Sequence, residues 1–374
     1  MHTSATGSGH KSAADALVQE LRRMPGVEAE SFDTLTVSDP RVRSTQKGLI
    51  QAIGRIPRLS SWAFEAAVRG NPVTGWIGAV LMAVKAHFSP EALEHIQQFD
   101  PDLIVSTQAE ANGMLDHWRG ELHAPVCAVM TDHLADNRWT YDSVEHYFVA
   151  NERMRDDLDR LGVDASRVSV TGIPVRSEFA QPAPGDAKRR LGLDPDLPAV
   201  LITGGGLGLQ PYKQLVEELN RHPYPMQIVC VTGSNQAARA DLKAMKQGSV
   251  HKLFIEGTVN NMPDWMGASD VVVTQAGGLT TSEILALGKP MILHRPGRGL
   301  ARRNAERLQE LGTALVGSSL QDTADKVERL LKDPELKARV ATGLKKAGHP
   351  HAARSVAEKV VAAARAAQIQ SRNG

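Results

Sequence analysis

The chain has 374 residues, of which 42% are hydrophobic and 23% are charged, so it is long enough to build two hydrophobic cores. Its formal net charge of +1 gives no global attraction to nucleic acid, which argues against a nucleic-acid-binding protein. Cys127 and Cys230 lie in apolar runs and indicate buried thiols of a cytoplasmic protein. The sequence has no apolar run of about 18 residues that would span a membrane.

Short apolar runs alternate with longer amphipathic segments along the chain. The runs are apolar at successive positions, which is typical of parallel strands covered on both faces. The expected strands are Asp102–Ser106, Val126–Met130, His146–Val149, Val168–Thr171, Ala199–Thr203, Gln227–Val231, Lys252–Ile255, Asp270–Thr274, Pro290–His294 and Thr313–Val316. Helical patterns lie between many of them, for example a helix that Asn151 can cap and Gly162 can end. This alternation predicts doubly wound α/β domains.

The first glycine loop, Thr6–His10, lies very close to the start of the sequence. A loop of this kind normally follows a strand that is central in its sheet. Only Met1–Ala5 remain to form this strand, whereas a strand typically has ~5–6 residues. A short strand is one interpretation. The sequence favours the other, an in-frame upstream extension of a few apolar residues that ends in His2–Ala5.

A proline-rich stretch with few apolar residues, 174–198, divides the chain. We therefore expect an N-terminal domain over 1–176, a linker over 177–197 and a C-terminal domain over 198–348. The remaining residues, 349–374, contain an alanine-rich helical segment after a proline break, and this helix can pack back on the N-terminal domain.

Three glycine-rich turns, Gly7–His10, Gly204–Gly208 and Gly277–Thr281, each precede a helical pattern. Glycine lets the backbone approach a ligand closely, and the free N–H groups at a helix start favour an anion such as a diphosphate. Either threonine of the third turn can cap the next helix, which places Glu283 in its first turn. Glu283 is then either part of the cap or a ligand-binding carboxylate.

The residues from Gly257 to Pro290 resemble the donor site of the monogalactosyl- and glucosyl-diacylglycerol synthase family, relatives of the peptidoglycan N-acetylglucosaminyltransferase. The likeness extends over most of the chain, to Gly7–Leu17, Thr131–Trp139, Tyr147–Pro174 and Gly204–Gly208. It implies a GT-B fold, in which two Rossmann-like doubly wound domains face each other across a cleft. The acceptor would bind on the N-terminal side and a UDP-sugar on the C-terminal side.

The resemblance also implies roles for individual residues. Glu283 would hold the ribose hydroxyls, and the backbone around Val259 would read the edge of the uracil. The other residues implied in nucleotide-sugar binding are Gly205, Gly206, Gly277, Gly278, Leu279, Thr280 and Asn304. Such enzymes invert the anomeric centre and use neither a cofactor nor a bound metal, because helix starts and loop amides stabilise the leaving UDP.

His10 is the first candidate for the catalytic base. The positive end of the helix that begins there favours a neutral imidazole, which can take a proton from an acceptor hydroxyl. Asp132, which follows the expected strand Val126–Met130, is the competing candidate. Either residue can instead be structural, His10 as a cap or surface residue and Asp132 as a cap or turn former.

The sugar-reading half of the site departs from the family. Relatives usually carry a Gln-Glu or Gln-Gln pair at the positions of Leu300 and Ala301, whose side chains cannot form hydrogen bonds. Relatives also have histidine where this chain has Asp136, and often lysine where it has Gln275. A nearby arginine cluster indicates either a solvated basic surface or a charged donor sugar. Its members are Arg298, Arg302 and Arg303.

The stretch Gln46–Phe88 interleaves basic residues with tryptophan on amphipathic segments, which suits an anionic membrane surface. The candidates for contact with the acceptor or the membrane are Arg55, Trp62, Trp76 and, outside this stretch, Trp139. A set of helices that merely covers the N-terminal sheet is the alternative interpretation.

These observations together predict an inverting, metal-independent glycosyltransferase that moves a hexose from a UDP-sugar to a lipid acceptor such as diacylglycerol. We expect it in the cytoplasm, peripherally bound to the inner face of the cell membrane, with no nucleic-acid partner. Two alternatives stay open. One is a UDP-sugar 2-epimerase-like isomerase, which has the same fold and binds the nucleotide in the same way. The other is a non-catalytic nucleotide-sugar-binding protein, which Leu300 and Ala301 make credible.

Overall fold

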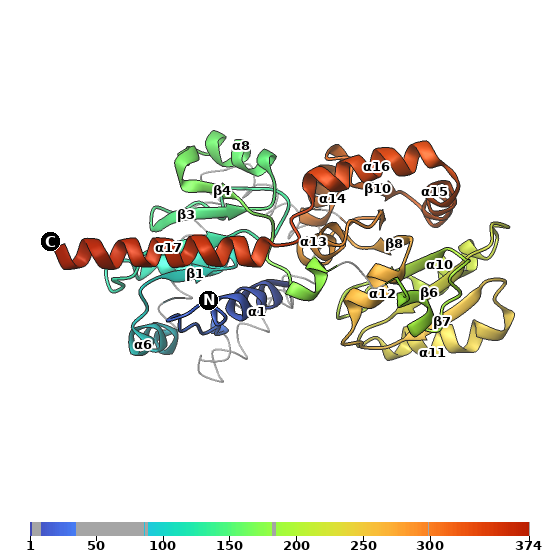
Figure 1. Ribbon diagram of the computed structural model, residues 1–374, viewed down its shortest axis with the longest axis horizontal. Coiled ribbons are helices and arrows are strands. Elements are labelled where there is room, and N and C mark those ends of the chain that lie inside the picture. Colours follow the sequence, from blue (N-terminus) through green and yellow to red (C-terminus); the bar gives the residue numbers. More distant parts are fainter. Residues whose placement is uncertain (2–8, 35–85, 87–88, 182–184, 298, 374) are drawn as a thin grey trace. The chain divides into compact units, whose positions relative to one another are not determined.

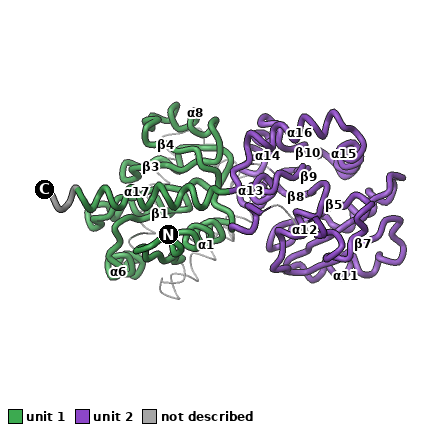
Figure 2. The backbone as a smooth tube through the Cα atoms, viewed as in Figure 1, with its two compact units in different colours: residues 1–176, 351–374 green, residues 177–350 purple. Residues whose placement is uncertain are grey.

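The computed structural model describes residues 1, 9–34, 86, 89–181, 185–297 and 299–373 (Figure 1). The chain divides into two compact units (Figure 2). Unit 1 consists of residues 1–176 and 351–374, and unit 2 of residues 177–350. Each unit contains one parallel β-sheet. Among the described residues, no helix is both long and apolar enough to cross a membrane.

Unit 2 has a six-stranded sheet in the order β7-β6-β5-β8-β9-β10. The strands are β5 (Ala199–Thr203), β6 (Gln227–Val231), β7 (Lys252–Glu256), β8 (Val271–Thr274), β9 (Met291–His294) and β10 (Ala314–Gly317). All five residues of β5 are buried, and Leu201 is paired with Val229 of β6 on one side and with Val272 of β8 on the other. This is the strand order of a dinucleotide-binding Rossmann sheet, with β5 as its first and central strand.

The described helices of unit 2 precede, connect and follow its strands. They are α9 (Ala187–Arg190), α10 (Tyr212–Leu219), α11 (Gln236–Met245), α12 (Met262–Ala268), α13 (Gly278–Ala286), α14 (Leu300–Glu310), α15 (Leu320–Lys332) and α16 (Pro334–Ala347). Side chains cap several of them; Asn235, for example, accepts a hydrogen bond from the amide of Ala238 at 3.0 Å. The segment expected as a linker, 177–197, belongs to this unit, because Phe179 and Leu193 are buried in it.

Unit 1 has a four-stranded sheet in the order β1-β2-β3-β4. The strands are β1 (Ile104–Ser106), β2 (Val126–Val129), β3 (Val144–Val149) and β4 (Val168–Val170). The helices are α1 (Gly9–Leu21), α6 (Pro90–Phe99), α7 (Ala109–His117), α8 (Glu152–Arg160) and α17 (Ala352–Asn373). As the sequence predicts, Asn151 caps α8 through the amide of Met154, at 3.2 Å.

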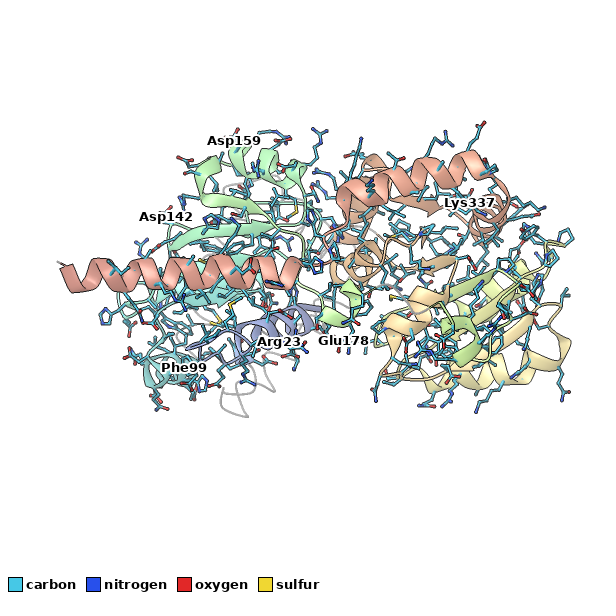
Figure 3. All side chains as sticks on the ribbon, in the orientation of Figure 1. Arg23, Phe99, Asp142, Asp159, Glu178 and Lys337 are labelled. Carbon is cyan, nitrogen blue, oxygen red and sulfur yellow. The ribbon has the colours of Figure 1, made fainter. Side chains whose placement is uncertain are left out.

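The hydrophobic core of unit 1 contains side chains from helices near both ends of the chain. Helix α17 lies beside α1, and both helices pack on the sheet (Figure 1). Leu17 and Leu21 from α1 and Val356 from α17 form one buried cluster with Cys127 and Phe148 of the sheet. Exposed charged side chains such as Asp159 and Lys337 project from the helices of their units (Figure 3).

Both cysteines are buried, as the sequence predicts. Burial, and then the charge of Glu145, raises the pKa of the Cys127 thiol to about 12. Burial also raises the pKa of Cys230. Because the thiolate is the reactive form of cysteine, neither side chain is a nucleophile near neutral pH.

Candidate active site

The sheet of unit 2 has one topological switch point, between β5 and β8. These strands are neighbours in the sheet but are separated in sequence, and the loops that follow them lie at the same carboxyl edge. Ligands of open α/β sheets bind at such a point. The two loops there are Gly204–Gly208 and Gln275–Gly277.

The loop after β5 is a tight turn that requires glycine. The amide of Gly208 donates to the carbonyl of Gly205 at 3.0 Å, and both residues have positive φ angles of +60° and +67°. A Cβ atom at Gly208 would lie 1.9 Å from the carbonyl oxygen of Thr232, so no side chain fits there. A Cβ atom at Gly205 would instead lie 3.9 Å from Oγ1 of Thr280. This loop therefore faces the start of α13.

A third loop, Gly233–Asn235 after β6, holds the first one in place. The amide of Ser234 donates to the carbonyl of Gly206 at 3.0 Å, and Nδ2 of Asn235 donates to the carbonyl of Gly208 at 3.0 Å. This loop was not predicted from the sequence. Its Gly-Ser-Asn sequence directly after a buried strand is the signal that could have revealed it.

Helix α13 presents its free amide groups at the same edge. It begins at Gly278 with Gly277 as its N-cap, and its first internal bond runs from the amide of Thr281 to the carbonyl of Gly277 at 3.2 Å. In an α-helix the N–H groups before that bond have no partner within the helix. The amides of Gly278, Leu279 and Thr280 are thus placed to bind an anion.

The expectation that a threonine caps this helix is wrong. Oγ1 of Thr281 donates to the carbonyl of Gly277 at 2.7 Å, and the helix starts at Gly278, before both threonines. Glycine can take the N-cap position without a side-chain bond, which a pattern search for capping side chains misses. Glu283 consequently lies in the second turn, half-buried, and is no part of a capping box.

Asn304 and Gln275 support the loop after β8. Nδ2 of Asn304 donates to the carbonyl of Ala276 at 3.2 Å. Asn304 is only 1% exposed. Asn304 therefore positions the loop, and its predicted contact with the nucleotide-sugar stays a prediction. Nε2 of Gln275 donates to the carbonyl of Leu209, which ties this loop to the one after β5.

The other predicted donor-site residues lie at the same edge of the sheet. Val259 is half-buried in the segment that follows β7. Leu300 and Ala301 form the first turn of α14, after β9, and both are half-buried. Arg302 is exposed and Arg303 half-buried, while Arg298 lies outside the described residues.

Unit 1 places His10 in the first turn of α1 and fixes its imidazole. Nδ1 lies 3.0 Å from the carbonyl oxygen of Thr107 and 2.7 Å from Oγ1 of Thr131. A carbonyl oxygen can only accept, so the network assigns the hydrogen to Nδ1. The neutral imidazole then carries its lone pair on Nε2, which is the nitrogen that a general base uses.

Asp132 follows Thr131 directly and is 8% exposed. The guanidinium of Arg138 lies in its electric field and pairs with Asp136, with Nη2 at 2.6 Å from Oδ2. Burial lowers the pKa of Arg138, but the bond to Asp136 and the charges of Asp136, Asp132 and Glu110 outweigh it and raise the pKa. An aspartate–arginine pair thus stands where the family resemblance implies a histidine.

Of the residues predicted to contact the acceptor or the membrane, the structure describes Trp139. Trp139 is only 1% exposed and packs inside unit 1, where its carbonyl accepts a bond from Asn112 at 3.1 Å. Its ring is therefore part of the core, contrary to the predicted surface role. Arg55, Trp62 and Trp76 lie outside the described residues.

Two family models together match most of the chain. The family model for monogalactosyldiacylglycerol (MGDG) synthase matches residues 10–175, and the model for the glycosyltransferase family 28 C-terminal domain matches residues 199–360. The chain is 30% identical over 272 residues to the processive diacylglycerol beta-glucosyltransferase of Bacillus pumilus, covering 72% of this chain and 70% of that protein. The chain belongs to the glycosyltransferase family that includes monogalactosyldiacylglycerol synthase and this processive diacylglycerol beta-glucosyltransferase.

Other comparisons agree with this assignment and with the fold. The chain is also 30% identical over 254 residues to the enzyme of the same name from Bacillus subtilis, covering 67% of this chain and 66% of that protein. The crystal structure of MurG from Acinetobacter baumannii matches with a TM-score of 0.54 and 17% identity, over 73% of this chain and 77% of that one. The UDP-GlcNAc 2-epimerase of Neisseria meningitidis matches with a TM-score of 0.59 and 14% identity, over 96% and 98%. The fold is therefore GT-B, as the sequence predicts.

Proposed function

We propose that this glycosyltransferase moves a hexose from a UDP-sugar to diacylglycerol, with inversion and without a bound metal. The observation that carries the proposal is the carboxyl edge of β5 and β8, where two glycine loops meet the start of α13. The amides of residues 278–280 offer hydrogen bonds to a diphosphate. Glu283, one turn further along the helix, offers a carboxylate to the ribose hydroxyls. The relatives named above support diacylglycerol as the acceptor.

His10 supplies the base in this proposal. Its Nδ1–H is held by the carbonyl of Thr107, so Nε2 takes the proton from the acceptor hydroxyl. The acceptor oxygen then attacks the anomeric carbon from the face opposite UDP. The bond between that carbon and the phosphate oxygen breaks, and its electron pair leaves with UDP. The amides at the start of α13 stabilise the charge that develops on the diphosphate, so the step needs neither a metal nor a cofactor.

Asp132 is the second candidate for the base. Its carboxylate is buried beside Thr131 and interacts electrostatically with the Arg138 guanidinium. We assign Asp132 to the organisation of the acceptor side of the site, together with the Asp136–Arg138 pair.

The sugar is recognised largely by main-chain groups. Leu300 and Ala301 occupy the first turn of α14, and their side chains offer no hydrogen bond to sugar hydroxyls. The amides of that turn remain available for this purpose. A lipid acceptor places the reaction at a bilayer surface, and we propose peripheral attachment to anionic lipid on the inner face of the cell membrane.

Release of UDP tests the proposal. The purified protein is incubated with UDP-glucose, UDP-galactose or UDP-glucuronic acid, each with and without diacylglycerol in mixed micelles, and with and without EDTA. We expect UDP release from one of these donors that depends on diacylglycerol and is insensitive to EDTA. Conversion of the UDP-sugar to its epimer without an acceptor would instead identify an isomerase. Donor binding without any turnover would identify a non-catalytic binding protein, and either result overturns the proposal.

A further inference from the structure

Two leucines project into solvent from the glycine loop that follows β5 in unit 2. Leu207 is 63% exposed and Leu209 is 58% exposed. Among the residues that the structure describes, the other large hydrophobic side chains with comparable exposure are Val250 and Ile369. Single exposed apolar side chains are common on protein surfaces. The two leucines differ because they lie on one short loop, whose segment 204–209 is otherwise composed of glycine.

The backbone of this loop is bonded inward, which leaves the leucine side chains facing solvent. The amide of Leu209 donates to the carbonyl of Gly204 at 3.2 Å, and its carbonyl accepts a hydrogen bond from Nε2 of Gln275. The carbonyls on either side of Leu207 accept hydrogen bonds from the loop after β6, each at 3.0 Å. A fixed turn therefore presents the exposed leucines.

The leucines lie at the edge of the unit 2 sheet where we place the diphosphate. The strands of this sheet pair in parallel, so every loop that follows a strand lies at the carboxyl edge. The loop after β5 lies there, together with the start of α13. Val250 lies two residues before β7 and hence at the amino edge. The two leucines are therefore on the ligand side of the sheet, and Val250 is on the opposite side.

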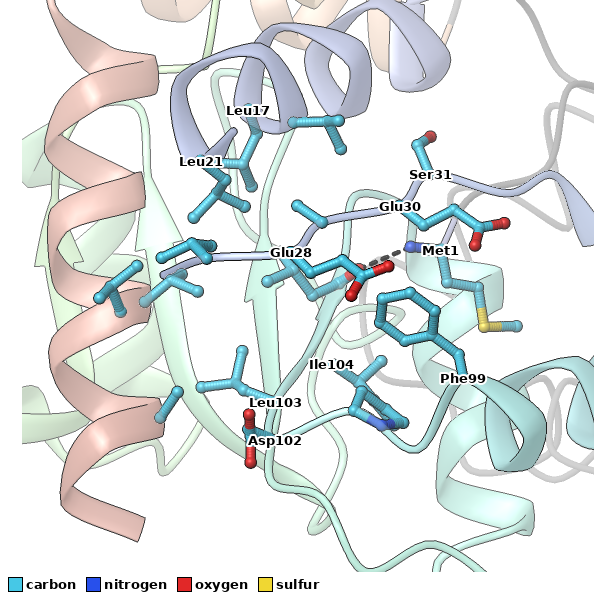
Figure 4. A pocket seen from close by; sticks show the side chains of 18 of the residues that line it. Met1, Leu17, Leu21, Glu28, Glu30, Ser31, Phe99, Asp102, Leu103 and Ile104 are labelled. Atoms are coloured by element: carbon cyan, nitrogen blue, oxygen red, sulfur yellow. Dashed lines mark hydrogen bonds between the residues drawn. The ribbon is translucent and has the colours of Figure 1, made fainter. Parts of the chain in front are cut away.

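Apolar side chains around the cavity of unit 1 are arranged differently. Leu17, Leu21 and Ile104 line a cavity of about 380 Å³ there (Figure 4). All three residues are buried, so the unit itself already removes their apolar surface from water. They offer no exposed face to a lipid bilayer, whereas Leu207 and Leu209 each expose more than half of their surface.

The proposed reaction brings lipid to the carboxyl edge of unit 2. The acceptor hydroxyl must reach the anomeric carbon, which is joined to the diphosphate that we place beside Gly205 and α13. In diacylglycerol this hydroxyl is only a few covalent bonds from the ester groups that carry the acyl chains. Leu207 is two residues from Gly205, at most about 7 Å along an extended chain. The leucines thus lie close to the apolar boundary from which the acceptor is taken.

We propose that Leu207 and Leu209 insert among the acyl chains of the bilayer that carries the lipid acceptor. The inference rests on the proposed function for the identity of that acceptor. Insertion removes leucine surface from water, and a loop without charged side chains enters the apolar boundary without desolvating a charge. It gives the nucleotide-binding unit a membrane contact of its own. This contact persists in high salt, whereas an attraction between basic residues and anionic lipid is screened.

Vesicle binding by matched variants tests the proposal. The unchanged chain, the double variant Leu207→Ser with Leu209→Ser, and the control Val250→Ser are sedimented with phosphatidylcholine vesicles that contain diacylglycerol. High salt screens the attraction between charges. We expect the double variant to bind these vesicles ~10-fold or more weakly than the unchanged chain, because two leucine side chains no longer leave water. Val250→Ser should bind as the unchanged chain does.

A fluorophore on the loop measures insertion directly. Both native cysteines are buried and their thiols have raised pKa values, so a thiol reagent labels a cysteine introduced at the surface. Leu207→Cys and Val250→Cys are labelled with an environment-sensitive dye and mixed with the same vesicles. We expect a blue shift of the dye emission at position 207 and none at position 250.

Failure of the unchanged chain to bind these vesicles, equal binding by the double variant and the control, or equal dye shifts at the two positions would overturn the proposal. Vesicle binding that survives in the double variant while its UDP affinity falls would assign the leucines to the donor instead. Loss of self-association in the double variant, with vesicle binding retained, would assign them to a second copy of the chain, and both results overturn the proposal. The vesicle measurements need no turnover. Binding through the leucines without any release of UDP would therefore contradict the proposed function alone.

Discussion

Gly205 is the glycine whose replacement separates ligand binding from folding. Its φ angle is +67°, and a Cβ atom there would meet only Oγ1 of Thr280, at an ordinary contact distance of 3.9 Å. Gly205→Ala therefore introduces no clash, and its cost to folding is the left-handed backbone conformation of alanine, about 1 kcal/mol. The new methyl group, however, points across the space between the loop and the start of α13, where we place the diphosphate.

We expect Gly205→Ala to weaken UDP binding by ~1–3 kcal/mol, about 5- to 150-fold, because a displaced diphosphate loses a charge-assisted hydrogen bond. Titration calorimetry with UDP measures the affinity, and urea denaturation measures the free energy of unfolding. Gly192→Ala is the matched control. Gly192 also lies in unit 2, has a φ angle of +73°, and a Cβ atom added there would have no neighbour within 4 Å, so it introduces the same strain away from the site.

The two variants should lose similar stability and differ only in UDP affinity. Equal UDP affinity in Gly205→Ala and Gly192→Ala would refute the placement of the diphosphate beside this loop. Gly208→Ala marks the opposite extreme, because its Cβ atom would lie 1.9 Å from the carbonyl oxygen of Thr232. That variant should fail to form the native loop and should lose both stability and binding.

Glu283→Gln should weaken UDP binding by ~1–3 kcal/mol at nearly unchanged melting temperature, and unchanged affinity in calorimetry would remove Glu283 from the ribose site. His10→Ala should reduce turnover by ~10²–10⁴-fold while UDP binding persists. Near-normal turnover in His10→Ala, with a large loss in Asp132→Asn, would transfer the role of base to Asp132. The protein should also sediment with anionic vesicles, and less so as salt rises; equal binding to neutral vesicles would exclude the electrostatic attraction.

The strands could be predicted from the sequence nearly to their ends. The expected strands Val168–Thr171 and Asp270–Thr274 correspond to β4 (Val168–Val170) and β8 (Val271–Thr274). Buried parallel strands are apolar at every position, so their signal is local and strong. The order of the strands in the unit 2 sheet then follows the rules of doubly wound folds, and with it the edge at which a ligand binds.

The supporting contacts of the site could not be predicted in the same way. Asn235 bonds to Gly208 and Asn304 to Ala276 across more than twenty residues of sequence, and no local pattern marks such a pair. The start of α13 was misplaced because a glycine N-cap leaves no side-chain signature. The burial of Trp139 depends on packing within unit 1, whereas its sequence context fitted an exposed aromatic residue equally well.

The anomeric configuration of the lipid product tests the central claim most directly. The purified protein is incubated with diacylglycerol and UDP-glucose, in which the sugar is α-linked. If the protein uses UDP-galactose instead, that donor replaces UDP-glucose. The glycolipid is then analysed by mass spectrometry and NMR. We predict a β-linked hexosyl-diacylglycerol formed in equal amount with UDP, and its loss in His10→Ala. An α-linked product would contradict inversion. Binding of a UDP-sugar without formation of any glycolipid would contradict transfer to diacylglycerol by this chain.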